Sequence, residues 1–143
     1  MPALRNFLLG TSASSTLTDA ALLLLRVTFG LALALAHGIG KVPPSERFVG
    51  VTAEMGFPLP VLFAWAAGLA EFVGGLLLAV GLLTRPAAAF ASITMAVAAF
   101  VRHAGDAFAE RELALLYLAV MVVLALTGAG RYSVDAALRR RLM

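Results

Sequence analysis

The sequence predicts an all-α integral membrane protein, a four-helix bundle with both its N- and C-termini in the cytoplasm. Of its 143 residues, 62% are hydrophobic and 13% are charged, and the mean hydropathy is +0.96. Soluble domains carry about 25% charged residues, so this chain has too little charge for a water-soluble surface. The stretch from Ala87 to Val101 also lacks the polar stripe that a helix of a soluble bundle shows. We therefore expect lipid around the helices.

Four apolar segments have about the length of a membrane-spanning helix, which needs roughly 20 residues. They cover about residues 20–38, 61–83, 86–102 and 113–130. Arg26 is the one charge inside the first segment, and Glu71 is the one charge inside the second. The third segment is slightly short, so we expect Arg102 to snorkel from its last turn. These limits define a single membrane domain over residues 1–143.

The distribution of basic residues predicts the orientation. One side of the four segments carries six basic residues and two acids, and the other carries four basic residues and five acids. Because cytoplasmic loops are enriched in Lys and Arg, the first side is expected to face the cytoplasm. Its basic residues are Arg5, Arg85, Arg131, Arg139, Arg140 and Arg141. Residues 131–141 are expected to form a basic amphipathic helix on anionic headgroups.

The longest outer loop is predicted to contain a short helix. Ser45 is a suitable N-cap, and Phe48, Val51 or Thr52, and Met55 then fall on one helical face. Such a helix can form a lid over the bundle, although the same pattern is also compatible with plain loop packing.

Composition excludes several classes of function. The chain has no cysteine, so disulfide chemistry, a structural zinc site and an iron–sulfur cluster are not expected. It has no dinucleotide-binding fingerprint. The basic residues are scattered between apolar stretches, which argues against nucleic-acid binding. No metal site is predicted, and we do not expect the two histidines to ligate a haem.

The buried charges are the most informative residues. A charged side chain in hydrocarbon costs at least about 2.5 to 3.5 kcal/mol, and this cost needs a compensating interaction. We expect Arg26 and Glu71 to pair across the first two helices through charge-assisted hydrogen bonds. This pair either holds the bundle together or takes part in binding a ligand, and the two interpretations are left open.

Further polar residues are expected at the outer level of the bundle. Arg26 and His37 are eleven residues apart and share one face of an ideal helix, with Lys41 near its outer end. His103 closes the third helix at the same level, and Tyr117 on the fourth helix can line a space between them. An apolar cavity with a few convergent polar groups is the usual form of a site for an amphipathic head group.

The chain resembles the DoxX family of membrane proteins. The resemblance is carried by four stretches in order: LLLRVTFGLALALAHGIGK with Arg26, His37 and Lys41, GFPLP from Gly56, AGLAEFVGGLLLAVGLLTRPAA with Glu71, and LTGAGRYSVDAAL from Leu126. It implies a four-helix protein of the bacterial inner membrane with a redox-linked role. It further implies a quinone ligand, because relatives include a membrane subunit of a thiosulfate:quinone oxidoreductase.

This resemblance and the residues together lead to our functional hypothesis, a membrane subunit of a quinone-linked oxidoreductase system. The candidate ligand-binding residues are Arg26, His37, Lys41, Glu71, His103 and Tyr117. Electrons would come from a soluble redox partner protein, since the chain has no redox group of its own. The alternative is a non-enzymatic scaffold or assembly factor, and a small-molecule or proton pathway is a third, weaker option. Small-residue helix faces also allow a homodimer.

Overall fold

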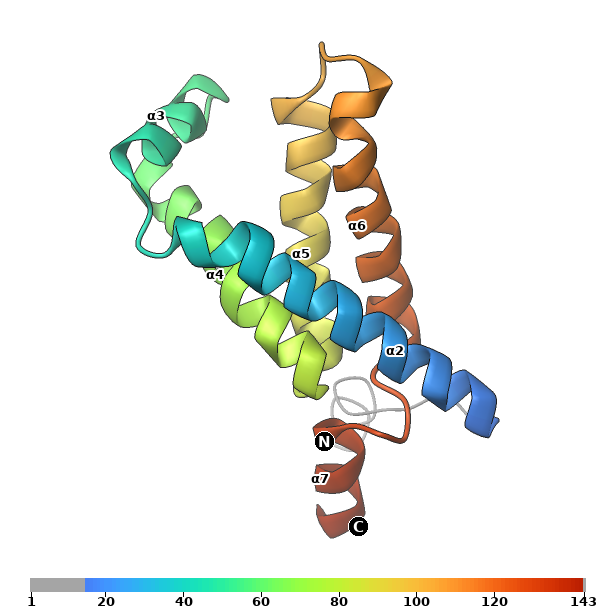
Figure 1. Cartoon of the computed structure of the whole chain (residues 1–143). Coiled ribbons are helices and arrows are strands. Elements are labelled where there is room, and N and C mark those ends of the chain that lie inside the picture. Colours follow the sequence, from blue (N-terminus) through green and yellow to red (C-terminus); the bar gives the residue numbers. More distant parts are fainter. Residues whose placement is uncertain (1–14, 143) are drawn as a thin grey trace.

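The computed structural model describes residues 15–142, and every regular element in that range is helical (Figure 1). In chain order these elements are α2 (Thr16–Ala32), a π-helical turn η1 (Leu33–Gly38), a 3-10 turn η2 (Ile39–Lys41), α3 (Glu46–Glu54), α4 (Pro60–Val80), α5 (Thr84–Val97), a second π-helical turn η3 (Ala98–Arg102), α6 (Phe108–Thr127) and α7 (Val134–Leu142). The predicted all-α class is therefore confirmed. Arg5, which contributed to the predicted orientation, lies outside the described residues.

Three helices of the described part are long and apolar enough to cross a membrane. They are the continuous helices Thr16–Lys41, Pro60–Val80 and Thr84–Arg102. The fourth predicted span corresponds to α6, which has 20 residues but carries Glu110, Arg111 and Glu112 near its start. The count of four spans accordingly stays a prediction.

Local signals set the helix limits and explain their differences from the predicted ones. The first long helix begins at Thr16, because the Ser15 hydroxyl accepts a hydrogen bond from the backbone N–H of Thr18 and caps it. α4 ends at Val80 rather than near residue 83, because Gly81 adopts a left-handed conformation with a φ of 73°. α5 begins two residues before the expected Pro86, because the Asp135 carboxylate accepts hydrogen bonds from two N–H groups at its start.

α2 packs along α4 at very close range, which glycines make possible. A Cβ atom on Gly30 would lie 2.6 Å from the carbonyl oxygen of Gly75, and a Cβ on Gly75 would lie 2.6 Å from that of Gly30. Only hydrogen at both positions allows the two backbones to touch. This contact fixes the register in which the two antiparallel helices meet.

The bundle has two distinct ends (Figure 1). α5 and α6 run side by side, and α3 lies at one end of the molecule while α7 lies at the opposite end. We refer to these as the α3 end and the α7 end. Between them the core contains Leu33, Leu78, Ala88, Ala91, Met121 and Leu124.

The predicted tail helix is present as α7 and is anchored by its first turn. The Asp135 carboxylate accepts hydrogen bonds from the N–H groups of Leu83, at 2.7 Å, and Thr84, at 3.0 Å. The N–H of Asp135 in turn donates to the carbonyl oxygen of Gly81, at 2.8 Å. α7 is thereby fixed to the turn that joins α4 to α5.

Candidate functional site

The predicted pair between Arg26 and Glu71 is wrong. The register set at Gly30 and Gly75 places Arg26 level with Ala79, about 12 Å along α4 from Glu71. The Arg26 guanidinium therefore donates to the backbone oxygens of Leu78, at 3.2 Å, and Ala79, at 2.6 Å. It also donates to the backbone oxygen of Tyr132, in the segment before α7.

Arg26 thus has a structural role at the α7 end. The last carbonyl groups of a helix have no partner within that helix, and the C-terminal end carries a partial negative charge. Arg26, which is 2% exposed, satisfies two of these groups at the end of α4 and one group of the chain leading to α7. Its burial is compensated by the fold itself.

Glu71 forms an ion pair with Lys41 instead. The Lys41 ammonium lies 2.7 Å from Oε1 and 2.6 Å from Oε2 of the carboxylate, so it bonds both oxygens. The Glu71 side chain is 2% exposed and that of Lys41 is 32% exposed. The ammonium also lies 5.3 Å from the centre of the Phe48 ring on α3, within reach of a cation–π interaction. Lys41 therefore connects α4 to α3.

The π-helical turn η1 explains why ideal α-helical spacing did not predict the pair of Lys41 and Glu71. A π turn holds one residue more than an α turn, which rotates everything after it by about 100°. His37 consequently faces α6, where its ring packs edge-on against Tyr117 with centroids 5.4 Å apart. Lys41, beyond the turn, reaches Glu71 on α4.

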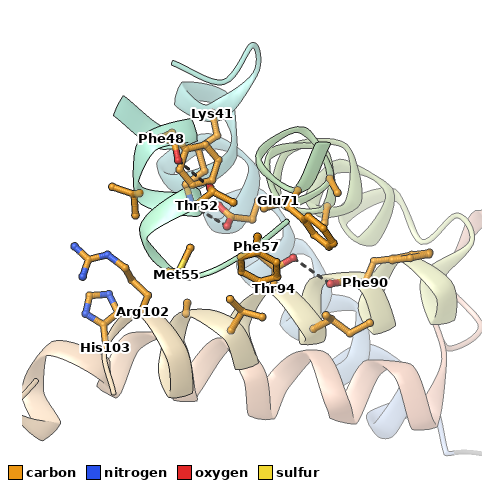
Figure 2. Close-up of a pocket in the computed structure, with 18 residues that line it drawn as sticks. Lys41, Phe48, Thr52, Met55, Phe57, Glu71, Phe90, Thr94, Arg102 and His103 are labelled. Atoms are coloured by element: carbon orange, nitrogen blue, oxygen red, sulfur yellow. Dashed lines mark hydrogen bonds and ion pairs between the residues drawn. The ribbon is translucent and has the colours of Figure 1, made fainter. Parts of the chain in front are cut away.

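A cavity of about 490 Å³ lies between α3, α4 and α5, next to the ion pair (Figure 2). Its ionisable lining residues are Lys41, Glu71, Arg102 and His103, and most of its wall is apolar. The two threonines in the wall, Thr52 and Thr94, donate their hydroxyl hydrogens to backbone oxygens of their own helices. The charged and imidazole groups are therefore the polar partners that a ligand would meet.

The lid predicted from the sequence covers part of this cavity. Ser45 caps α3 by accepting a hydrogen bond from the N–H of Phe48, at 3.3 Å. Phe48 and Met55, predicted for the inner face, line the cavity, and so do both Val51 and Thr52, between which the prediction did not choose. The expected lid helix and its orientation are both confirmed.

Arg102 and His103 lie together at the end of η3, which continues α5 (Figure 2). His103 Nδ1 is 2.7 Å from a carboxylate oxygen of Asp106. Within residues 15–142, no acidic side chain forms an ion pair with Arg102. The Arg102 guanidinium is exposed, and it supplies a positive charge at the edge of the cavity.

The structure therefore brings together three of the six predicted site residues, Lys41, Glu71 and His103. The other three, Arg26, His37 and Tyr117, do not line the cavity. Arg102, expected only to snorkel, is the lining residue that sequence reasoning missed. Its place beside His103 at the end of the same predicted helix was the available signal.

The fold and this site define a class of protein. The chain is a multi-pass membrane protein with membrane-length helices and an ion pair at the wall of an apolar cavity. It belongs to the DoxX family, whose sequence model matches residues 21–104. Among its relatives, inner membrane protein YqjF of Escherichia coli is 30% identical over 134 residues, covering 87% of this chain and 97% of the relative.

A second relative supports the same assignment. A Haemophilus influenzae protein described as uncharacterized is 41% identical over 109 residues, covering 71% of this chain and 78% of the relative. No solved structure matches the chain significantly. The family, the relatives and the apolar helices together make this a protein of the bacterial inner membrane, in contact with lipid.

Proposed function

We propose that this DoxX protein binds a quinone-type ligand in the cavity between α3, α4 and α5, as the membrane subunit of an oxidoreductase system. The observation that carries the proposal is the ion pair between Lys41 and the buried Glu71 at the wall of a mostly apolar cavity. An apolar wall with a few polar groups suits a ligand with an apolar body and two polar atoms.

The chemistry of the lining groups fits a quinone ring. Quinone carbonyl oxygens accept hydrogen bonds, and the Lys41 ammonium, the Arg102 guanidinium and a His103 N–H are donors. The reduced form has hydroxyl groups that donate, and the Glu71 carboxylate accepts. The site therefore offers partners to both redox forms of such a ligand.

The electrons are proposed to pass to or from a soluble partner protein. The chain has no cysteine and no dinucleotide fingerprint, so its sequence offers no familiar electron carrier. Its own residues would bind and orient the ring.

We also propose that α6 is a fourth span and that both termini face the cytoplasm. Arg85 donates to the backbone oxygen of Leu126 near the end of α6, so it lies at the same end as Arg131 and the three arginines of α7. This clustering of basic residues at the α7 end supports a cytoplasmic location for that end.

The test is equilibrium binding of a water-soluble quinone headgroup analogue to the full chain in detergent micelles. Glu71→Gln is expected to weaken binding at least about tenfold, since a hydrogen bond involving a charged group contributes about 1.5 to 3 kcal/mol. Glu110→Gln, at an exposed acid outside the cavity, is the matched control and is expected to leave affinity unchanged. Equal affinity of the Glu71→Gln variant and the wild type would contradict the proposal.

One observation favours the scaffold hypothesis: the terminal nitrogens of Arg26 join α2 to the end of α4 and to the chain before α7. The scaffold hypothesis predicts that no quinone binds and that the double variant Lys41→Met/Glu71→Met captures the same partner protein as the wild-type chain. With both results, the ion pair has only a structural role, like that of Arg26, and the scaffold hypothesis replaces the quinone hypothesis.

A further inference from the structure

We infer that the ligand enters the cavity sideways from the hydrocarbon of the membrane, between α4 and α5, and that its apolar tail stays in this opening. The inference rests on the proposed function and narrows it, because it identifies the ligand as a long-tailed quinone confined to the membrane rather than a short, water-soluble one.

The first observation is that some lining residues also belong to the outer surface. Phe63 on α4 is 38% exposed, and Phe90 and Ile93 on α5 are 65% and 61% exposed, yet all three line the cavity. Phe63 lies in the first turn of α4, whereas Phe90 and Ile93 lie well inside the membrane-length helix Thr84–Arg102, where exposed apolar residues face lipid. The cavity is therefore open to hydrocarbon between these residues.

The second observation is the direction of polarity inside the cavity. Figure 2 shows Arg102 and His103 at one end of the cavity and Phe90 at the opposite end. Lys41 lies beside Phe48 of the lid, at the α3 end. An amphiphile thus fits in one orientation, with its polar ring towards the α3 end and its tail towards Phe90 and the lipid.

The third observation is size. The cavity volume of about 490 Å³ lies in the lower part of the range of about 300 to 1,000 Å³ for small-molecule sites, which suits a substituted quinone ring but not a long isoprenoid tail as well. The rest of a long tail has to leave through the opening, where it exchanges one apolar environment for another at little cost.

Small side chains on α4 provide the width of this opening. Ala66 and Ala70 lie one turn apart on the face that carries Phe63, and both line the cavity. Ala66 is exposed and lies outside the core, so a larger side chain there is expected to narrow the opening. The substitution Ala66→Phe is therefore a selective block.

The experiment compares two quinones with the same ring, one with a long isoprenoid tail and one with a single methyl group in its place. Binding of each is measured to the full chain in detergent micelles. Ala66→Phe is expected to weaken binding of the long-tailed quinone at least about tenfold more than binding of the tail-less one. Ala89→Phe, at an exposed residue of α5 that does not line the cavity, is the matched control and is expected to change neither affinity.

The outcomes separate this inference from the function on which it rests. If Ala66→Phe leaves both affinities unchanged, or lowers both equally, the lateral opening is refuted while quinone binding stands. If the wild type binds neither quinone, the proposed function is refuted and the lateral opening with it. An unchanged unfolding transition for Ala66→Phe confirms that the variant is folded.

Discussion

Replacing Lys41 or Glu71 singly is expected to lower the free energy of unfolding by different amounts. Lys41→Met leaves a carboxylate that is 2% exposed without its partner. An uncompensated buried charge of this kind costs about 3 to 5 kcal/mol. Glu71→Gln instead leaves an ammonium on a side chain that is 32% exposed. Its cost is about 1.5 kcal/mol, close to the value of one hydrogen bond to a charged group.

The double variant Lys41→Met/Glu71→Met removes both charges and replaces them with apolar side chains of similar length. Such replacements of a buried pair are often neutral or stabilising. We therefore expect the double variant to be more stable than Lys41→Met by about 3 kcal/mol or more. The expected pattern is that the two single variants lose different amounts of stability and that the double variant regains most of it.

The assay is denaturant unfolding of the full chain in detergent micelles, which gives the free energy of unfolding of each variant. Arg47→Met, at an exposed basic residue of α3, is the control for loss of one positive charge and is expected to change stability by less than about 0.5 kcal/mol. If Lys41→Met costs no more than Glu71→Gln, the Glu71 carboxylate is either hydrated or protonated, and the reasoning from burial is refuted.

Three further variants are expected to lower the free energy of unfolding in the same assay. Gly30→Ala places a Cβ atom 2.6 Å from a backbone oxygen of α4 and is expected to cost about 1 to 3 kcal/mol, whereas Gly40→Ala, which points into open space, is the control; equal effects would show that the helices do not touch there. Asp135→Ala removes two hydrogen bonds at the start of α5 and is expected to cost about 0.5 to 2 kcal/mol and to speed proteolysis of α7, and an unchanged cleavage rate would argue against the anchor. Arg26→Met removes the Arg26 donor from the backbone oxygens of Ala79 and Tyr132 and is expected to cost at least about 1 to 3 kcal/mol, so a variant as stable as wild type would contradict its structural role.

Sequence reasoning was most successful where a local signal is sufficient. The lid is an example, because Ser45 is a recognisable cap and the apolar residues after it repeat at helical spacing. The end of the third predicted helix at Arg102 is another, since charge marks the limit of an apolar segment. Such features depend on a few neighbouring residues, which the sequence displays directly.

The partners of the buried charges could not be predicted in the same way. The sequence indicates that Arg26 and Glu71 each need compensation, but the choice of partner depends on how α2 slides along α4. That register comes from the contact of Gly30 with Gly75, and the last part of the helix is then rotated by the π turn before Lys41. Both are properties of packing between distant segments.

The two buried charges differ in what they leave available to a ligand. The Arg26 guanidinium directs its terminal N–H groups to three backbone oxygens of the chain, so the fold uses them. An ammonium has three donors and a carboxylate has about four acceptor positions. The two hydrogen bonds between Lys41 and Glu71 leave capacity on both groups, beside the cavity. Insertion of either charge costs at least about 2.5 kcal/mol. The Nε of Arg26 has no hydrogen-bond partner, but Arg26 does not line the cavity, whereas the spare capacity of Lys41 and Glu71 does face it. A ligand is therefore expected to contact Lys41 and Glu71 and not Arg26.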